Sequence, residues 1–261
     1  MLEVADAGTR SRQRLPEAVA SEWLKLRTVR STLVTLAVTF VLCVGLGALF
    51  SFARRTHLSP DPTRVSLQGF VFADISIGVI GVLIVTAEYS AGTMRATLAA
   101  VPHRQTVLLA KAIVLFVVTS LAGVAFAVVS FLVGQAILRG HAPSASLTDP
   151  ASLRAVLLAG LSLGLLTLVA MGLGLLLRHT AGAIAVYVTF VFVLLLIVAA
   201  LPSSWSDPIM KYLPEVLTEA MRTTKELEVS AFSPWTSTAV LAGYAVGFLA
   251  LGGVRFVRHD A

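Results

Sequence analysis

The sequence contains few of the residues on which soluble enzymes depend. Charged residues make up only 13% of the 261, and the single cysteine, Cys43, excludes a disulfide within the chain. No histidine has a second histidine or a cysteine three or four residues away, so the sequence gives no support for a metal site. The phosphate-binding pattern G-x-x-x-x-G-K-S/T does not occur, and no lysine follows a glycine. We therefore expect a chain that is not an enzyme, with no catalytic residues and no cofactor of its own.

Hydrophobic residues, by contrast, make up 57% of the chain, and their distribution predicts the fold class. An average soluble domain is about 25% charged. Six stretches nearly free of charge each approach or exceed the roughly 20 residues that cross a bilayer as a helix. They are residues 31–52, 65–87, 112–138, 155–177, 180–201 and 229–254. None alternates with the period of a barrel strand, so the prediction is an all-α membrane protein with six transmembrane helices.

The distribution of lysine and arginine predicts the topology. The polar stretch before the first apolar run contains acidic and basic residues, so we expect no cleavable signal peptide. Basic residues are more frequent on the side of the amino terminus, which predicts a multi-pass cell-membrane protein with both termini cytoplasmic. The formal net charge of +6 then reflects topology and adds attraction to anionic membrane lipid. No basic stripe is interleaved with aromatic residues, so nucleic acid is not an expected partner.

Residues 1–30 are expected to form a cytoplasmic tail that contains an amphipathic helix. Pro16 can occupy the first turn of this helix, and acidic residues precede basic ones, as the helix dipole favours. The helix would lie along the membrane surface with its apolar face, Leu15, Val19, Trp23 and Leu26, toward lipid. A simple membrane anchor is the alternative. The residues assigned to this interface helix are Glu22, Trp23, Lys25, Leu26 and Arg27.

Residues 31–257 form the predicted six-helix domain, and residues 258–261 form a second cytoplasmic tail. The cytoplasmic loop 88–105 between the second and third spans contains a short apolar stripe. Gly92 interrupts the second helix, Thr93 can cap a new one, and Pro102 ends it. The stripe consists of Met94, Leu98 and Val101. Two turns of helix are not stable alone in water, so we expect the stripe to bind a groove on another protein, with an ordinary interfacial loop as the alternative.

The outer half of the domain has two further features. Asp74 is expected about eight residues, or 12 Å, inside the second span, where an unpaired charge would cost several kcal/mol. It should face the bundle or a water-filled cavity, either on a substrate path or as a hydrogen-bonded structural carboxyl. In the outer connector 202–234, Asp207-Pro208 can start a short helix that carries Ile209, Tyr212 and Leu213.

Small residues spaced four apart inside the spans predict close contacts between helices. They occur at Gly160 and Gly164 and again at Gly243 and Gly247. Such pairs let two backbones approach closely, either within one bundle or between two copies of the chain.

Several of these motifs together resemble a known family. Glu88-Tyr89, Gly92-Thr93, Arg95, Leu98, Pro102 and Arg104 resemble the coupling-helix signature of type-two ABC exporter permeases, the membrane subunits of ATP-binding-cassette transporters. The segment from Ser21 to Arg27 is similar to the interface helix of actinobacterial members. Further similarities are Tyr212-Leu213-Pro214, Ser233-Pro234-Trp235 and the carboxyl-terminal Arg258-His259-Asp260-Ala261, where His259 departs from the arginine that is frequent in that group.

This resemblance implies the function and the partners. It implies two permease copies, as a homodimer or with a paralogous permease in place of one copy. Two separate ATPase subunits would hold ATP and Mg and drive transport through the coupling helix. It also implies an outer gate of short re-entrant helices that includes Tyr212, Leu213 and Pro214. An ion-coupled secondary transporter or channel is the alternative, and a membrane scaffold without transport is third. A secondary transporter would favour several ionisable residues within the spans, whereas the sequence shows one convincing case, Asp74.

Overall fold

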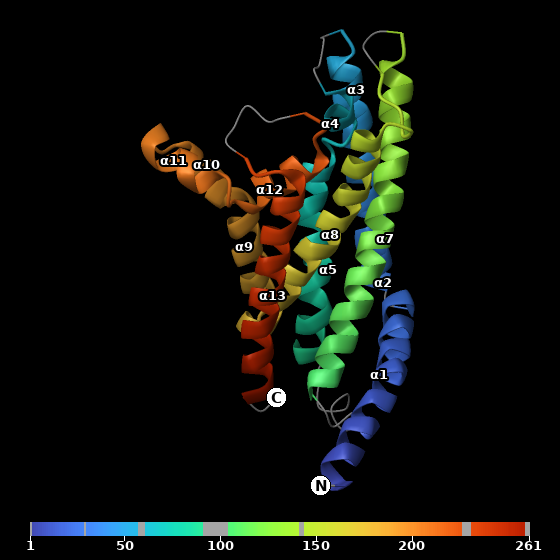
Figure 1. The fold of residues 1–261 in the computed structure, drawn as a ribbon, viewed down its shortest axis with the longest axis vertical. Coiled ribbons are helices and arrows are strands. Elements are labelled where there is room, and N and C mark those ends of the chain that lie inside the picture. Colours follow the sequence, from blue (N-terminus) through green and yellow to red (C-terminus); the bar gives the residue numbers. More distant parts are fainter. Residues whose placement is uncertain are drawn as a thin grey trace.

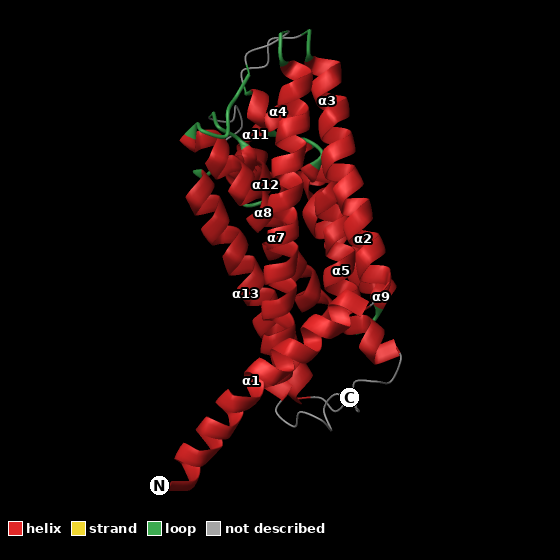
Figure 2. Ribbon diagram, turned by 90° about the vertical axis from the view of Figure 1, so that its right-hand side faces the viewer, coloured by secondary structure: helices red, strands yellow, loops and turns green. Residues whose placement is uncertain are grey.

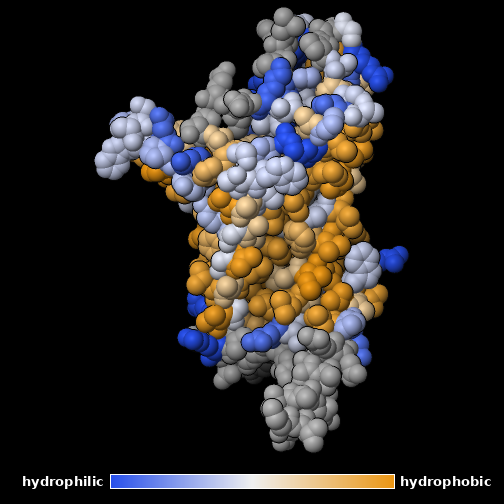
Figure 3. Space-filling model, in the orientation of Figure 1, coloured by the Kyte–Doolittle hydropathy of each residue, from blue (hydrophilic) through white to orange (hydrophobic). Residues whose placement is uncertain are grey.

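The computed structural model describes residues 2–28, 30–56, 61–90, 104–140, 144–225 and 231–258, and over these residues the secondary structure is helical with no strand. The predicted all-α class is therefore confirmed. Six helical segments of the described chain are long and apolar enough to cross a membrane, as predicted. Hydrophobic side chains form a band around the middle of the molecule, and hydrophilic ones gather toward both ends (Figure 3).

The spans run roughly along the long axis of the molecule, except that the end of the fifth bends away from the bundle (Figure 1). They are formed by α2 (Arg30–Val41) with η1 (Leu42–Leu46) and α3 (Gly47–Arg54), by α5 (Phe70–Ser90), α7 (Arg104–Leu138) and α8 (Pro150–Leu177), by α9 (Thr180–Val188) with η2 (Thr189–Val193) and α10 (Leu194–Ala199), and by α13 (Pro234–Arg258). The elements η1 and η2 are π-helical turns inside the first and fifth spans.

The two ends of the bundle carry different short elements. The amino-terminal helix α1 (Leu2–Thr28) and the end of α13 lie at one end, which we call the terminal end (Figure 1). Figure 2 shows that α1 also extends obliquely beyond the bundle. The opposite, distal end carries three short helices: α4 (Pro62–Ser66), α11 (Ser203–Met210) and α12 (Pro214–Arg222). An even number of spans brings both termini to one side.

The helix α8 lies at the centre of the bundle. Of its apolar window, 83% is buried, and it packs against α5, α7 and α13. Gly160 permits the contact with α7, because a β-carbon there would overlap the backbone of Val124. The second glycine of the pair, Gly164, faces Ser120, which also belongs to α7. The packing role of this pair is confirmed, whereas the other pair, Gly243 and Gly247, has open space where β-carbons would be.

The second span begins later than the sequence predicted. Residues 65 and 66 belong to α4, which starts because Asp61 accepts the backbone N–H of Arg64 at 3.0 Å and Pro62 occupies the first turn. A turn then passes Gly69, whose backbone packs against the carbonyl groups of η1 so closely that no β-carbon fits. Asp74 is therefore only about 6 Å from the start of α5, one turn rather than two.

Two predicted helix starts are also placed differently. Pro16 lies inside α1 instead of in its first turn. The helix α11 begins at Ser203, because the carbonyl group of Pro202 accepts the first N–H bonds, so that Pro208 lies inside it. Tyr212 then lies in the turn that leads to α12, which begins at Pro214.

Candidate functional sites

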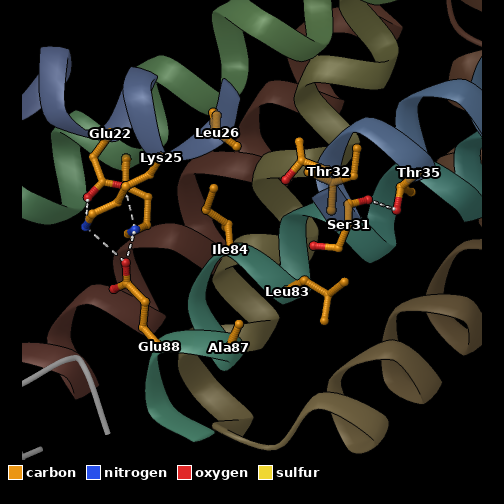
Figure 4. A pocket seen from close by; sticks show the side chains of 12 residues that line it. Glu22, Lys25, Leu26, Ser31, Thr32, Thr35, Leu83, Ile84, Ala87 and Glu88 are labelled. Carbon is orange, nitrogen blue, oxygen red and sulfur yellow. Dashed lines mark hydrogen bonds and ion pairs between the residues drawn. The ribbon is translucent and has the colours of Figure 1, made fainter. Parts of the chain in front are cut away.

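Four charged side chains from three helices form a cluster at the terminal end. Figure 4 labels three of them, Glu22, Lys25 and Glu88. Lys111 of α7 binds both acids, with its Nζ 2.6 Å from Glu22 Oε2 of α1 and 2.9 Å from Glu88 Oε1 of α5. Lys25 Nζ of α1 lies 2.7 Å from Glu22 Oε1 and 3.3 Å from Glu88 Oε1. We call Glu22, Lys25, Glu88 and Lys111 the terminal cluster. It joins the end of α1, the end of α5 and the start of α7.

The side of α1 that faces the bundle is set by a spacing of four residues. Ala18, Glu22 and Leu26 are buried, so Glu22 and Leu26 of the predicted interface helix make contact with the bundle. Trp23, which was predicted to share the face of Leu26, is 49% exposed and lines an apolar groove between α1 and α7. Arg27 is exposed. The helix therefore turns a face that is partly charged, rather than its most apolar one, toward the bundle.

The charges of the terminal cluster are matched, two acids with two bases. Burial works to raise the pKa of Glu22, but the neighbouring Lys111 and Lys25 hold it below its ordinary value. Burial likewise works to lower the pKa of Lys25, but its bonds to the two carboxylates hold it above its ordinary value. Glu22 and Lys25 therefore remain ionised near neutral pH. The ion pairs of the cluster fix three elements together.

A pocket of about 480 Å³ opens beside the terminal cluster. Charged side chains of the cluster line one end, and Ser31, Thr32 and Thr35 line the other (Figure 4). Apolar side chains of α5, among them Leu83 and Ile84, form the wall between them. A space of this size with a few polar groups is typical of small-molecule sites.

The predicted coupling residues lie mostly outside the described residues. Glu88 lies in the last turn of α5, which ends at Ser90, and Arg104 is the first residue of α7. The segment between them, residues 91–103, lies outside the described chain, and with it Gly92, Thr93, Met94, Arg95, Leu98, Val101 and Pro102. Their role stays a prediction. The terminal cluster nevertheless adjoins both helices from which this segment runs, through Glu88 and Lys111.

A second buried cluster lies at the distal end, around Asp74. The Asp74 side chain is fully buried and forms an ion pair with Arg222 of α12. Thr218 Oγ1 of α12 donates to Asp74 Oδ2 at 3.3 Å, and the Tyr187 hydroxyl group of α9 donates to the backbone oxygen of Asp74 at 2.6 Å. Asp74 thus faces the bundle, and its carboxylate holds α12 against α5.

Glu215 of α12 adds a second acid to this place. It is 4% exposed, and burial together with the Asp74 carboxylate raises the pKa of Glu215 to about 8. We call Asp74, Glu215 and Arg222 the distal cluster. It contains two acids and one base, so its charges are not matched.

Further contacts fix the carboxyl-terminal half of α12 to α4. Asp61 Oδ2 accepts the Thr223 hydroxyl group at 2.8 Å and the backbone N–H of Thr224 at 2.6 Å. Burial works to raise the pKa of Asp61, but these hydrogen bonds and the N–H of Arg64 hold it below its ordinary value. Arg64 also forms an ion pair with Glu219 at the surface.

The predicted gate residues lie where α11 meets α12. Leu213 is buried and packs with Val198 and Val216, and Pro214 begins α12. The Tyr212 ring packs edge-on against Phe232 with ring centroids 5.1 Å apart. Helix α12 packs against α8 and α13 at the distal end, whereas α11 contacts α10 and projects to the side of the bundle (Figure 1). Within the described residues, no three metal-ligating side chains gather at either end.

The sequence pattern of the ABC-2 family transporter proteins matches residues 18–199, which is well over half of the chain and includes α5, α7, α8 and both acids of α5. The chain belongs to the ABC-2 family. No curated protein matches its sequence. The chain is therefore a multi-pass permease subunit of an ABC transporter, a transport component that is not itself catalytic.

The most informative residues of this ABC-2 permease were not singled out from the sequence. Lys111, Glu215 and Arg222 were counted only as charges in or near connectors. One signal was available for Lys111, because it is the eighth residue of a long apolar helix, where a lone charge needs a partner. For Glu215 and Arg222 the available signal was their spacing of seven with Thr218 between them, which places all three on one helix face.

Proposed function

We propose that this ABC-2 permease is one half of an ATP-driven exporter whose motor is a separate ATPase subunit. The observation that carries the proposal is the terminal cluster, which ties α1 to the two helices from which residues 91–103 run. A partner that displaces this segment would move α1, α5 and α7 together. This is what a coupling element requires, because a displacement reaches the bundle only through a rigid connection.

The helix α5 supplies the connection between the two ends. It carries Glu88 of the terminal cluster near one end and Asp74 of the distal cluster near the other. The two acids are 14 positions apart, which is about 21 Å of continuous helix. We propose that ATP-driven movement at the terminal end is transmitted along α5 to α12 and so opens and closes the distal end.

In this proposal the terminal end is cytoplasmic and the distal end faces outward, as the lysine and arginine distribution predicts. Helix α1 then lies at the cytoplasmic membrane surface, and its exposed Trp23 contacts lipid. The outer gate consists of α11 and α12. Tyr212 and Leu213 lie in the turn between these helices, and Pro214 begins α12. Two permease chains and two ATPase chains form one particle, and ATP and Mg bind in the ATPase.

The coupling between ATPase and permease is tested by co-expressing the permease with the ATPase whose reading frame lies nearest to its own. We expect no ATP hydrolysis by the permease alone and stimulated hydrolysis by the complex in lipid. Leu98→Asp would place a charge in the apolar contact, which should cost several kcal/mol and dissociate or uncouple the pair. Ala96→Asp is the matched control, because helical spacing places Ala96 on the opposite face.

Normal co-purification and transport by Leu98→Asp would overturn the coupling role. Equal loss in both variants would show that the segment does not bind as a one-sided helix. ATP hydrolysis by the permease alone would contradict the proposal that a separate ATPase subunit hydrolyses ATP. A transport-competent particle with one permease chain would contradict the proposed stoichiometry. Reaction of a cysteine at position 225, in a Cys43→Ser background, only after permeabilisation would reverse the proposed orientation.

A further inference from the structure

The distal cluster contains one acid more than the bases that face it. Helix α12 presents Glu215, Thr218 and Arg222 on one face, toward Asp74 of α5. Asp74 and Arg222 neutralise each other as an ion pair. Glu215 is buried beside them, and its second carboxyl oxygen, Oε2, has no hydrogen-bond partner among the described residues.

The other charged and titratable groups around α12 do not supply the missing positive charge. On α12 itself, Glu219 is paired with Arg64 of α4 at the surface. On α8, the Arg154 guanidinium donates to the backbone oxygen of Thr223, beyond the last residue of α12, at 2.9 Å. Asp61 of α4 accepts hydrogen bonds from Thr223 and Thr224, beyond the end of α12, and adds no positive charge. Two tyrosine hydroxyls donate to backbone oxygens, Tyr187 of α9 to Asp74 and Tyr244 of α13 to Tyr212.

Burying a lone carboxylate costs much more free energy than burying a carboxylic acid, so a buried acid without a partner charge takes up a proton. A proton on Glu215 makes the distal cluster neutral as a whole: one ion pair and one neutral acid. The same acid in contact with water would ionise at neutral pH, because hydration stabilises the carboxylate.

We propose that Glu215 is a proton-binding site whose occupancy keeps α12 seated on the bundle, and that unseating α12 releases this proton to the medium. In that step the O–H bond of the Glu215 carboxyl breaks, the proton passes to water, and the carboxylate becomes hydrated. The proposal rests on the proposed function only in treating α12 as part of the outer gate. The proton site itself requires neither an ATPase nor transport.

The direction of the pH dependence follows from the two environments of Glu215. The pKa of Glu215 is raised to about 8 when α12 is seated, against an ordinary value of 4.5 in water. Between these values the seated state holds one more proton than the unseated state. Raising the pH therefore favours unseating by up to about tenfold per pH unit over this range, with no further effect above it.

Infrared spectroscopy of the full-length permease in lipid nanodiscs tests the proton directly. We expect the spectrum at neutral pH to contain the C=O stretch of a protonated carboxyl group that disappears as the pH is raised past about 8. Glu215→Gln should lack this band, and Glu219→Gln should retain it. Absence of the band in the wild-type protein, or its persistence in Glu215→Gln, would overturn the proposal.

Cysteine labelling tests the link to α12 in the same preparation. Ala220, a buried residue of α12, is replaced by cysteine in a Cys43→Ser background, and the labelling rate is divided by that of Lys225→Cys, an exposed reference. The normalised rate should rise with pH up to about 8 and then level off, and Glu215→Gln should abolish the rise. A rise that survives Glu215→Gln, or a pH-independent rate in the parent, would refute the link. Failure of the ATPase experiments alone would leave both of these results intact.

Discussion

The two ends of the bundle use the same chemistry with different charge counts. At the terminal end, two carboxylates meet two ammonium groups, and every ion pair is between separate helices or adjacent turns of α1. At the distal end, two buried carboxyl groups meet one guanidinium. The matched cluster balances its charges without taking up or releasing a proton, so it can act as a fixed joint. The unmatched cluster has to exchange a proton when its environment changes.

The helix α5 makes this difference relevant to transport, because it contributes one acid to each cluster. Ion pairs that persist keep α1, α5 and α7 together when one of these helices moves. The contact of α12 with the bundle depends on a proton on Glu215, so less free energy is needed to separate α12 when water can accept this proton. The terminal cluster lies at the end where we propose that the ATPase binds, and the distal cluster lies where we propose the gate.

The largest expected effect is on the distal cluster. Arg222→Met leaves the buried Asp74 carboxylate without a partner charge, and breaking a buried ion pair in this way costs about 3–5 kcal/mol. Thermal unfolding in detergent, followed by the monodisperse fraction on size-exclusion chromatography, should show a large loss of stability. Adding Asp74→Asn should restore most of it, because no unpaired charge remains. A double variant as unstable as the single one would show that Arg222 acts by shape and not by charge.

Removing one base from the terminal cluster should have a smaller effect. Lys111→Met leaves Lys25 to pair with both acids, so we expect a loss of about 2 kcal/mol, the scale of a hydrogen bond to a charged group. The same unfolding assay measures it. Adding Glu22→Gln restores charge balance and should recover part of the loss. If Lys111→Met proves as damaging as Arg222→Met, the contrast between the two clusters is wrong.

The pH dependence of stability should separate the clusters. The raised pKa of Glu215 means that its contribution to stability is complete below its ordinary value of 4.5 and is lost as the pH rises toward about 8. The slope is at most about 1.4 kcal/mol per pH unit. Glu22, with its lowered pKa, contributes above 4.5 and loses this contribution only at lower pH. Between about pH 5 and 8, the melting temperature of Glu215→Gln should therefore change less with pH than that of the wild type. Glu22→Gln should keep the pH dependence of the wild type over this range.

The smallest effect is expected at the surface ion pair of the distal end. Arg64 and Glu219 are 44% and 33% exposed, and exposed pairs contribute about 0–1 kcal/mol. Glu219→Gln should therefore change the melting temperature little at low salt and still less at high salt. A loss comparable to that of Arg222→Met would mean that α12 is held from outside and not through Asp74.

Much of the fold could be predicted because it depends on local features. A span is defined by about 20 consecutive residues, so its position follows from hydropathy without knowledge of the other spans. The contact of Gly160 with α7 was also predictable, because small residues at spacing four mark close packing. The later start of α5 at Phe70 was missed because Val65 is apolar yet belongs to a short helix that Asp61 caps.

The sequence alone determined the fold class, the number of spans and the family resemblance, because each depends on residues read in order along the chain. The tertiary structure alone decided which charges meet. Asp74 and Arg222 are 148 residues apart, and Glu22 and Lys111 are 89 apart, so no local spacing connects them. The packing of helices brings these side chains together in a medium without water, and there the balance of acids and bases decides which groups keep their charge.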